Sequence, residues 1–422
     1  MNGLRRTDIL VVGGGIAGIS AAIAAKAADR RKYVILVGEE PFPYRRPSIF
    51  SLIKGGSFED LAIFGRSQAL EQGIRSFFNS KIEVLDLEDR FAKLGNGERI
   101  LFERAVLAMG GKPFIPSVEG SGIKGVFSLR SYSDALGISK QVRAGVRCFI
   151  IGAGLIGVKL ASILHKKGVK VTLVELKKVL WTLLEEPLSN QVRDLLISNG
   201  ISVIEGQEIE LIMGQGHVSS VKLGGKRYEA DFVVFASGVR PRVEVVSHQL
   251  KLGVKGAIET DEVMRTSVEG VYACGDCSET MDFISGKKTF KPIGNIAYKA
   301  GKIAGANSAG EENSYKGFVR LQGDEFLGTC MTSIGLTRAE AKVLGVSYKI
   351  LALKPFKSVA TTYSSVLKPN SNFLVIVDSK EKLIGFQAIG KRLSRKNVHS
   401  ISTLISMRAE VEELRSLGLE PV

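Results

Sequence analysis

The chain has 422 residues, of which 45% are hydrophobic and 24% charged, so it can bury the cores of two or three domains and contains no segment that demands a membrane span. Its 58 basic and 43 acidic residues give a net charge of +15, which implies an acidic partner or a generally basic surface. With four cysteines it offers no disulfide framework, and a reducing cytoplasm is the simplest compartment.

The first predicted elements form a strand, a glycine-rich turn and a helix. An apolar run at 9–12 precedes a G-x-G-x-x-G pattern, and a second apolar run at 34–37 is followed by Glu39. The pattern glycines are Gly13, Gly15 and Gly18. Glycine suits this turn because backbone N–H groups at a helix N-terminus must approach a pyrophosphate closely, while the later acid accepts ribose hydroxyls. The segment therefore predicts a βαβ unit that binds a dinucleotide.

A second copy of this pattern follows further along the chain. The apolar run 148–151 precedes it, and Glu175 ends the next apolar run. Its glycines are Gly152, Gly154 and Gly157. One copy alone could be a tight turn that uses glycine for packing, but two copies with strand, helix and acid in register favour two dinucleotide sites. One site should hold a bound cofactor and the other an exchanging one.

A further repeat supports a duplication. The segments 105–116 and 232–241 each place an apolar strand before Gly-x-x-Pro, at Gly110 and Gly238. Repetition over this length indicates two related α/β domains rather than a solenoid, whose period would be roughly 20 to 50 residues.

Five motifs together make the chain similar to a known superfamily. They are the two glycine patterns, EEPFPYRRP (39–47), VYACGDC (271–277) and NIAYKAGKIAGAN (295–307). In content and order they resemble the FAD-dependent pyridine nucleotide-disulfide oxidoreductases over nearly the whole chain. The most similar branch is the one containing CoA-disulfide reductases, NADH oxidases and peroxidases.

The resemblance implies roles for individual residues. The first glycine pattern would bind FAD, Asp276 would contact the FAD ribitol, and Arg46 and Pro47 would lie beside the flavin. The second pattern would bind the nicotinamide coenzyme. There Glu175 would accept both ribose hydroxyls and favour NADH, while the basic pair 177–178 keeps NADPH possible.

The fold class that follows is α/β, with two Rossmann-like dinucleotide-binding domains and a C-terminal α+β domain of the dimerisation type. We expect an FAD domain at 1–111 and 242–315, an inserted NAD(P) domain at 112–241, and the C-terminal domain at 316–422. The last domain should contain a hairpin over 373–390 and a helix over 398–417. A homodimer is implied by the resemblance.

Departures from the superfamily pattern lie where the flavin is expected. Ser48 aligns with the position of a redox cysteine, and a hydroxyl cannot cycle through a sulfenate or a mixed disulfide. Ser51 stands where related electron-transfer reductases have a lysine, and Lys159 stands where they have the glutamate that pairs with it. Lys159 could be an unpaired cation that stabilises anionic reduced flavin, or a lysine that points to solvent. Ser48 could equally be a turn residue.

The sequence therefore predicts an FAD-dependent NAD(P)H:acceptor oxidoreductase without a cysteine relay, whose acceptor could be oxygen, a quinone or a small, acidic electron carrier. Disulfide or polysulfide reduction of the CoA-disulfide type is the first alternative. A basic FAD-containing binding protein of the apoptosis-inducing-factor type is the second, although no nucleic-acid recognition motif supports it. Cys274 and Cys277 form a C-x-x-C, but no second pair completes a metal site.

Overall fold

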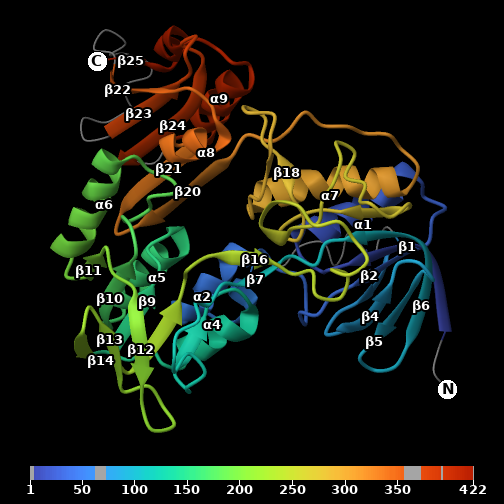
Figure 1. Ribbon diagram of the computed structural model, residues 1–422, viewed down its shortest axis with the longest axis horizontal. Coiled ribbons are helices and arrows are strands. Elements are labelled where there is room, and N and C mark those ends of the chain that lie inside the picture. The colour runs from blue at the N-terminus through green and yellow to red at the C-terminus, as the bar shows by residue number, and fades with distance from the viewer. Residues whose placement is uncertain (1–3, 62–72, 356–371, 391–392, 422) are drawn as a thin grey trace.

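The computed structural model describes residues 4–61, 73–355, 372–390 and 393–421. Figure 1 shows three units: an N-terminal sheet covered by two long helices, a second sheet with its own helices, and a C-terminal sheet that lies beside the second unit. The two parallel sheets and the separate antiparallel one confirm the expected α/β class with two Rossmann-like domains and an α+β unit. Among the helices described, none is long and apolar enough to cross a membrane.

The first unit is built on a parallel sheet in the order β3-β2-β1-β6, and β17 pairs with the end of β6. The antiparallel strands β4 and β5 extend the start of β6. Its elements are β1 (Leu4–Val12), α1 (Ile16–Ala28), β2 (Val34–Val37), β3 (Arg75–Phe77), β4 (Ile82–Asp86), β5 (Phe91–Leu94), β6 (Arg99–Leu107), β17 (Val271–Ala273) and α7 (Gly294–Ser308). Because β17 and α7 come from far along the chain, this unit is discontinuous in sequence.

Burial explains why these segments are strands. All four residues at 9–12 and all four at 34–37 are buried, as expected for central parallel strands that are covered on both faces. One face of this parallel sheet packs under α1 and α7, and its other face packs against the β4–β5 hairpin and residues 243–258.

Helices α1 and α7 contact each other through their backbones, and Figure 1 shows them lying side by side over the sheet. A Cβ at Gly301 would overlap the carbonyl oxygen of Ala17, and one at Gly305 would overlap that of Ala21. Glycines four residues apart lie on the same helix face, so they let the two helices approach over a full turn.

The second unit contains a parallel sheet in the order β11-β10-β9-β15-β8 and a small antiparallel sheet. Its elements are β8 (Val126–Ser128), α4 (Tyr132–Ser139), β9 (Arg147–Ile151), α5 (Leu155–Lys166), β10 (Lys170–Glu175), α6 (Glu186–Ser198), β11 (Ser202–Glu205), β12 (Ile209–Met213), β13 (Ser220–Leu223), β14 (Lys226–Glu229) and β15 (Phe232–Phe235). The succession β9-α5-β10 repeats β1-α1-β2, which is the predicted duplication at the level of structure.

The two segments that connect these units pair with each other. Strands β7 (Gly111–Pro113) and β16 (Val239–Pro241) form a two-stranded antiparallel ribbon between the units (Figure 1). Each strand directly follows one of the repeated glycines Gly110 and Gly238, both of which have positive φ. Short elements complete this part of the chain: η1 (Arg46–Ile49), α2 (Phe50–Ile53), η2 (Phe58–Asp60), η3 (Val254–Gly256), β18 (Thr280–Met281) and β19 (Lys288–Thr289).

The C-terminal unit is an antiparallel sheet in the order β20-β21-β24-β23-β22-β25. Its elements are β20 (Leu321–Phe326), β21 (Thr329–Gly335), α8 (Arg338–Leu344), β22 (Lys349–Pro355), β23 (Asn372–Val377), β24 (Leu383–Gly390), α9 (Arg395–Ser406), η4 (Val411–Leu417) and β25 (Leu419–Pro421). The hairpin expected over 373–390 is confirmed by the antiparallel pairing of β23 with β24.

The prediction of a single helix over 398–417 is wrong. Helix α9 ends at Ser406, and the chain turns before η4 because Arg408 adopts a positive φ of 55°. The Arg408 guanidinium forms an ion pair with Asp378 of the neighbouring turn, and this contact with a distant residue holds the break.

The α1–α7 contact makes a prediction about stability. Replacing Gly301 by alanine should lower the free energy of unfolding by about 1–3 kcal/mol, because the new Cβ overlaps backbone and the helices must separate. Gly294→Ala in the same helix is the matched control, since no atom lies within 4 Å of its added Cβ. Thermal unfolding of both variants should separate them, and an equal melting temperature would contradict the backbone contact.

Candidate functional site

The two glycine loops have the same local geometry. Gly13 and Gly152 have φ values of 121° and 108°. A Cβ on either one would overlap or crowd the backbone just after the neighbouring strand of the sheet, at Ala108 after β6 and at Ala236 after β15. The third glycines, Gly18 and Gly157, lie over the carbonyl oxygens of the first. These four glycines are therefore required by packing of the chain against itself.

The middle glycines serve a different purpose. Gly15 and Gly154 cap the N-termini of α1 and α5 with φ of −80° and −70°, values open to any residue. No heavy atom lies within 4 Å of a Cβ built on either one. Open space in front of a helix N-terminus is the place where a pyrophosphate binds, so both loops fit a dinucleotide.

The acids that follow the two loops differ in their surroundings. Glu175 ends β10, is only 9% exposed, and accepts N–H groups of Ala153 at 2.8 Å and of Lys177 at 3.0 Å. It is thereby tied to its own glycine loop. Glu39 is half-exposed and forms an ion pair with Arg242, which follows the ribbon strand β16. Each acid lies at the end of the second strand of its unit, as the pattern predicts.

Arg46 and Asp276 come together around Arg130, which the sequence did not single out. Asp276, which follows the left-handed Gly275, forms an ion pair with the Arg130 guanidinium. Arg46 donates to the Arg130 carbonyl oxygen at 2.7 Å, and burial together with the Arg130 charge lowers the pKa of Arg46. The Nε of Arg130 is buried without a hydrogen-bond partner, so it leaves a donor for a phosphate or hydroxyl oxygen of a cofactor.

Ser48 and Ser51 use their hydroxyl groups locally. Ser48 Oγ donates to the Arg45 carbonyl at 2.6 Å, and Ser51 Oγ donates to the Ser48 carbonyl at 2.7 Å. Pro47 is the second residue of the same 3₁₀ turn, where it lies exposed between Arg46 and Ser48. These contacts are typical of turn residues, and a catalytic role for Ser48 stays a prediction.

The expectation that Lys159 is an unpaired cation is wrong. Its Nζ contacts both carboxylate oxygens of Asp324, at 2.7 and 2.8 Å, and lies 4.9 Å from the centroid of the Phe50 ring. Asp324 belongs to β20 of the C-terminal unit and Phe50 to α2, so the pairing arises from segments that no local pattern connects. The lysine does not point freely to solvent either, because only 17% of its side chain is exposed.

Leu155, Gly238 and Lys177 lie in the segments next to the second glycine loop. Leu155 begins α5 and packs against the hydrophobic core there. Gly238, with φ of 113°, accepts the Phe114 N–H at 2.9 Å and so holds the start of the ribbon. The Lys177 ammonium lies 3.8 Å from the Trp181 ring, a cation–π contact beyond the end of β10.

The cysteines of the C-x-x-C pattern are buried thiols. Cys274 and Cys277 are fully inaccessible, and burial raises the pKa of Cys277 to about 11 and that of Cys274 well above its ordinary value. Cys148 is likewise buried with a raised pKa. Thiols react as thiolates, so these three are chemically inert at neutral pH.

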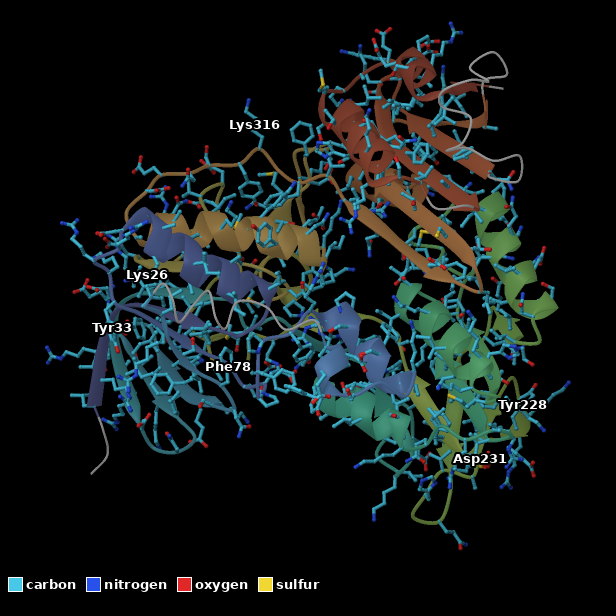
Figure 2. All side chains as sticks on the ribbon, turned by 180° about the vertical axis from the view of Figure 1, so that it is seen from behind. Lys26, Tyr33, Phe78, Tyr228, Asp231 and Lys316 are labelled. Carbon is cyan, nitrogen blue, oxygen red and sulfur yellow. The ribbon has the colours of Figure 1, made fainter. Side chains whose placement is uncertain are left out.

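Two open hollows of about 470 and 690 Å³ flank Arg147 at the edge where β9 and β10 begin. Tyr228 and Asp231 mark this edge in Figure 2, at the end of the second unit away from the first. Nucleotides bind at the opposite edge of such sheets, where the strands end and the glycine loops lie. We therefore place no coenzyme in these hollows.

The sequence analysis did not identify Arg130 or Asp324, and the two differ in how much the sequence around them indicates. Arg130 directly precedes a capping box in which the Ser131 hydroxyl accepts the Asp134 N–H, so the helix start was readable but the pairing with Asp276 was not. Asp324 lies in a polar strand with no motif around it. Only the tertiary fold reveals either partner.

Comparison with known proteins agrees with this geometry. The family model described as pyridine nucleotide-disulphide oxidoreductase matches residues 7–302. An NADH oxidase of Methanocaldococcus jannaschii is 30% identical over 425 residues, covering 97% of this chain and 93% of the relative. An NAD(P)H coenzyme A polysulfide/persulfide reductase of Pyrococcus horikoshii is 29% identical over 83% of this chain and 80% of its own. The solved NAD-dependent persulfide reductase of A. fulgidus superposes with a TM-score of 0.88 at 27% identity, covering 97% of this chain and 79% of that one.

The middle glycines allow the two sites to be told apart. Gly15→Ala should fold normally but be purified with much less FAD, because its Cβ occupies the space left for a pyrophosphate. Gly154→Ala should keep its FAD and bind NADH more weakly, by about tenfold for a loss of about 1.4 kcal/mol. Flavin absorbance and NADH titration measure both effects. If Gly154→Ala lost FAD and Gly15→Ala kept it, the two loops would have been assigned the wrong way round.

Proposed function

The chain belongs to the pyridine nucleotide-disulphide oxidoreductase family and is an FAD-dependent NAD(P)H oxidoreductase, and we propose that it passes electrons to its acceptor without a cysteine relay. Bound FAD accepts a hydride from NADH at N5 and can release electrons singly or in pairs. Dioxygen, a quinone or a small electron carrier can each serve as the acceptor of such an enzyme.

The placement of the cysteines carries this proposal. After the PYRRP segment the chain has Ser48, whose hydroxyl is bound in a turn, in place of a redox cysteine. Cys148, Cys274 and Cys277 are buried with raised pKa values. The fourth, Cys330, lies in β21 of the C-terminal unit rather than in either glycine loop. A relay needs an accessible thiolate next to the flavin, and none of the three buried thiols supplies one.

We assign the cofactors to the units as follows. Residues 1–111 and 242–315 form the FAD domain, whose first glycine loop, Arg46, Pro47 and Asp276 would hold FAD, with the free Arg130 Nε as an added donor. Residues 112–241 form the NAD(P) domain, where the second loop and Glu175 would hold the coenzyme. The return of β17 to the first sheet supports this division.

The C-terminal unit, 316–422, is proposed as a dimerisation domain, which makes the enzyme a homodimer. The net charge of +15 would draw an acidic electron carrier or an anionic small acceptor toward the protein. A reducing cytoplasm fits four cysteines that form no disulfide.

Disulfide or polysulfide reduction is the second candidate. It is supported by the relatives named as persulfide reductases, one of which covers 97% of this chain in structure. It would require either direct attack of reduced flavin on sulfur or a thiol that takes over the role of the missing cysteine.

A test with thiol reagents separates direct electron transfer from the thiol-dependent form of the second candidate. The folded holoenzyme is alkylated with iodoacetamide at pH 8, and the variant Cys330→Ser is prepared separately. In both cases the rate of flavin reduction by NADH and the rate of reoxidation by oxygen, quinone or carrier should stay within about twofold of the untreated wild type, since buried protonated thiols do not react. Anaerobic stopped-flow reduction followed by mixing with the acceptors measures both half-reactions. Loss of reoxidation after either treatment would show that a thiol relays electrons and would favour the second candidate.

The surroundings of Glu175 predict a preference for NADH. A carboxylate there accepts ribose hydroxyls and repels a 2′-phosphate, so kcat/KM should be higher for NADH than for NADPH. Glu175→Gln should lower kcat/KM for NADH about tenfold, because a charged hydrogen bond worth about 1.5 kcal/mol is weakened, and should narrow the difference between the coenzymes. Glu229→Gln, in β14 of the small antiparallel sheet of the same unit, is the control. A wild-type preference for NADPH would refute the assignment.

A further inference from the structure

Three separate segments of the chain meet at one ammonium group. Lys159 lies on α5 of the second unit, its ion-pair partner Asp324 on β20 of the C-terminal unit, and the ring beneath it, Phe50, on α2, which packs against α4 and α5. Asp324 Oδ1 also accepts the Glu325 N–H at 2.8 Å, which fixes the carboxylate on its strand. The carboxylate side of the contact is therefore held in place by its own strand.

The energetics of this pair suit a role in geometry. The side chains of Lys159 and Asp324 are 17% and 23% exposed, so both charges lose most of their hydration. For such pairs desolvation offsets most of the attraction, and the pair adds little net stability. Removing one partner, however, leaves the other charge uncompensated in the same place, so the structure strongly favours the paired arrangement over any shifted one.

A second contact lies on the same face of the helix. Ser162, three residues after Lys159, accepts the Leu327 N–H at 3.1 Å, and its side chain is buried. Residues three apart lie on one face of a helix, so the β20–β21 hairpin holds α5 at two points of that face. Two points fix both the position of the helix and its rotation about its axis.

Helix α5 carries this constraint to the coenzyme loop. It begins directly after Gly154, and Lys159 is five residues further, or about 7.5 Å along the axis at 1.5 Å per residue. A helix is stiff over so short a length, so a shift at Lys159 displaces the second glycine loop. Hydride transfer needs its two partners aligned, and a misplacement of about 1 Å can cost about 100-fold in rate.

We propose that Lys159 and Asp324 form an interdomain positioning pair, which sets the orientation of α5 and the second glycine loop for hydride transfer to the flavin. The inference rests on the proposed placement of FAD at the first loop and the nicotinamide coenzyme at the second. Lys159 acts here through geometry rather than through its charge, because the carboxylate of Asp324 neutralises that charge at 2.7 Å.

The test compares Lys159→Gln, Asp324→Asn and the reversed pair Lys159→Glu with Asp324→Lys, all as FAD-loaded proteins. Glu210→Gln, which breaks the exposed pair with Lys222 in the same unit, is the matched control. Four quantities are measured: the limiting rate of flavin reduction at saturating NADH, the Kd for NADH, the flavin midpoint potential, and hydrogen exchange of the amides at 155–166.

Both single variants should lower the limiting rate about 10- to 100-fold while the Kd changes less than threefold. Hydrogen exchange in α5 should accelerate in both and be restored, with part of the rate, in the reversed pair. The midpoint potential should stay unchanged in all variants. The control should match wild type in every quantity.

Two results would overturn the proposal. An unchanged limiting rate in Asp324→Asn would reduce the pair to a structural contact, and midpoint potentials that shift in opposite directions in the two single variants would show that charge, not position, matters. If NADH failed to reduce the wild-type flavin, the proposed function would fall instead. Hydrogen exchange of the α5 amides would then still test whether the pair positions the helix. An unchanged exchange rate in both single variants would refute the proposal.

Discussion

The contact of backbone with backbone at the first glycine loop determines where the rest of the first unit can lie. Gly18 packs on the Gly13 carbonyl and Gly13 on that of Ala108, which fixes the direction in which α1 leaves the sheet. From that direction α1 meets α7 at Gly301 and Gly305, and the Ala17 methyl group lies against Gly275. The position of Asp276, one residue later, thus follows from a loop more than 250 residues earlier in the chain.

Short-range patterns allowed much of this fold to be predicted. A glycine loop, the strand before it and the acid after it lie within about 30 residues, and the β23–β24 hairpin is a local alternation of apolar runs around a polar turn. The fold class could be predicted from such units. The break between α9 and η4 could not, because Arg408 turns the chain in response to Asp378, which is 30 residues away.

Two ion pairs at the candidate site join distant parts of the chain. Asp276 and Arg130 are 146 residues apart, and Lys159 and Asp324 are 165 apart. The C-terminal unit also contacts the second unit through Glu185 at the start of α6, which is buried and accepts from the Gln387 side chain and from the Arg338 N–H. Sequence patterns identify the residue types that suit a site, whereas pairings between units depend on how completed domains pack.

The β7–β16 ribbon has a consequence for the history of the chain. Because the two connecting strands are hydrogen-bonded to each other, the polypeptide leaves the first unit and returns to it at one point. A copy of the dinucleotide-binding unit could therefore be inserted there without pulling β6 and β17 apart, since they remain neighbours in the host sheet. Gene duplication followed by insertion at a single junction would account for both the internal repeat and the discontinuous first domain, and the same junction would let one inserted domain be exchanged for another as a cassette.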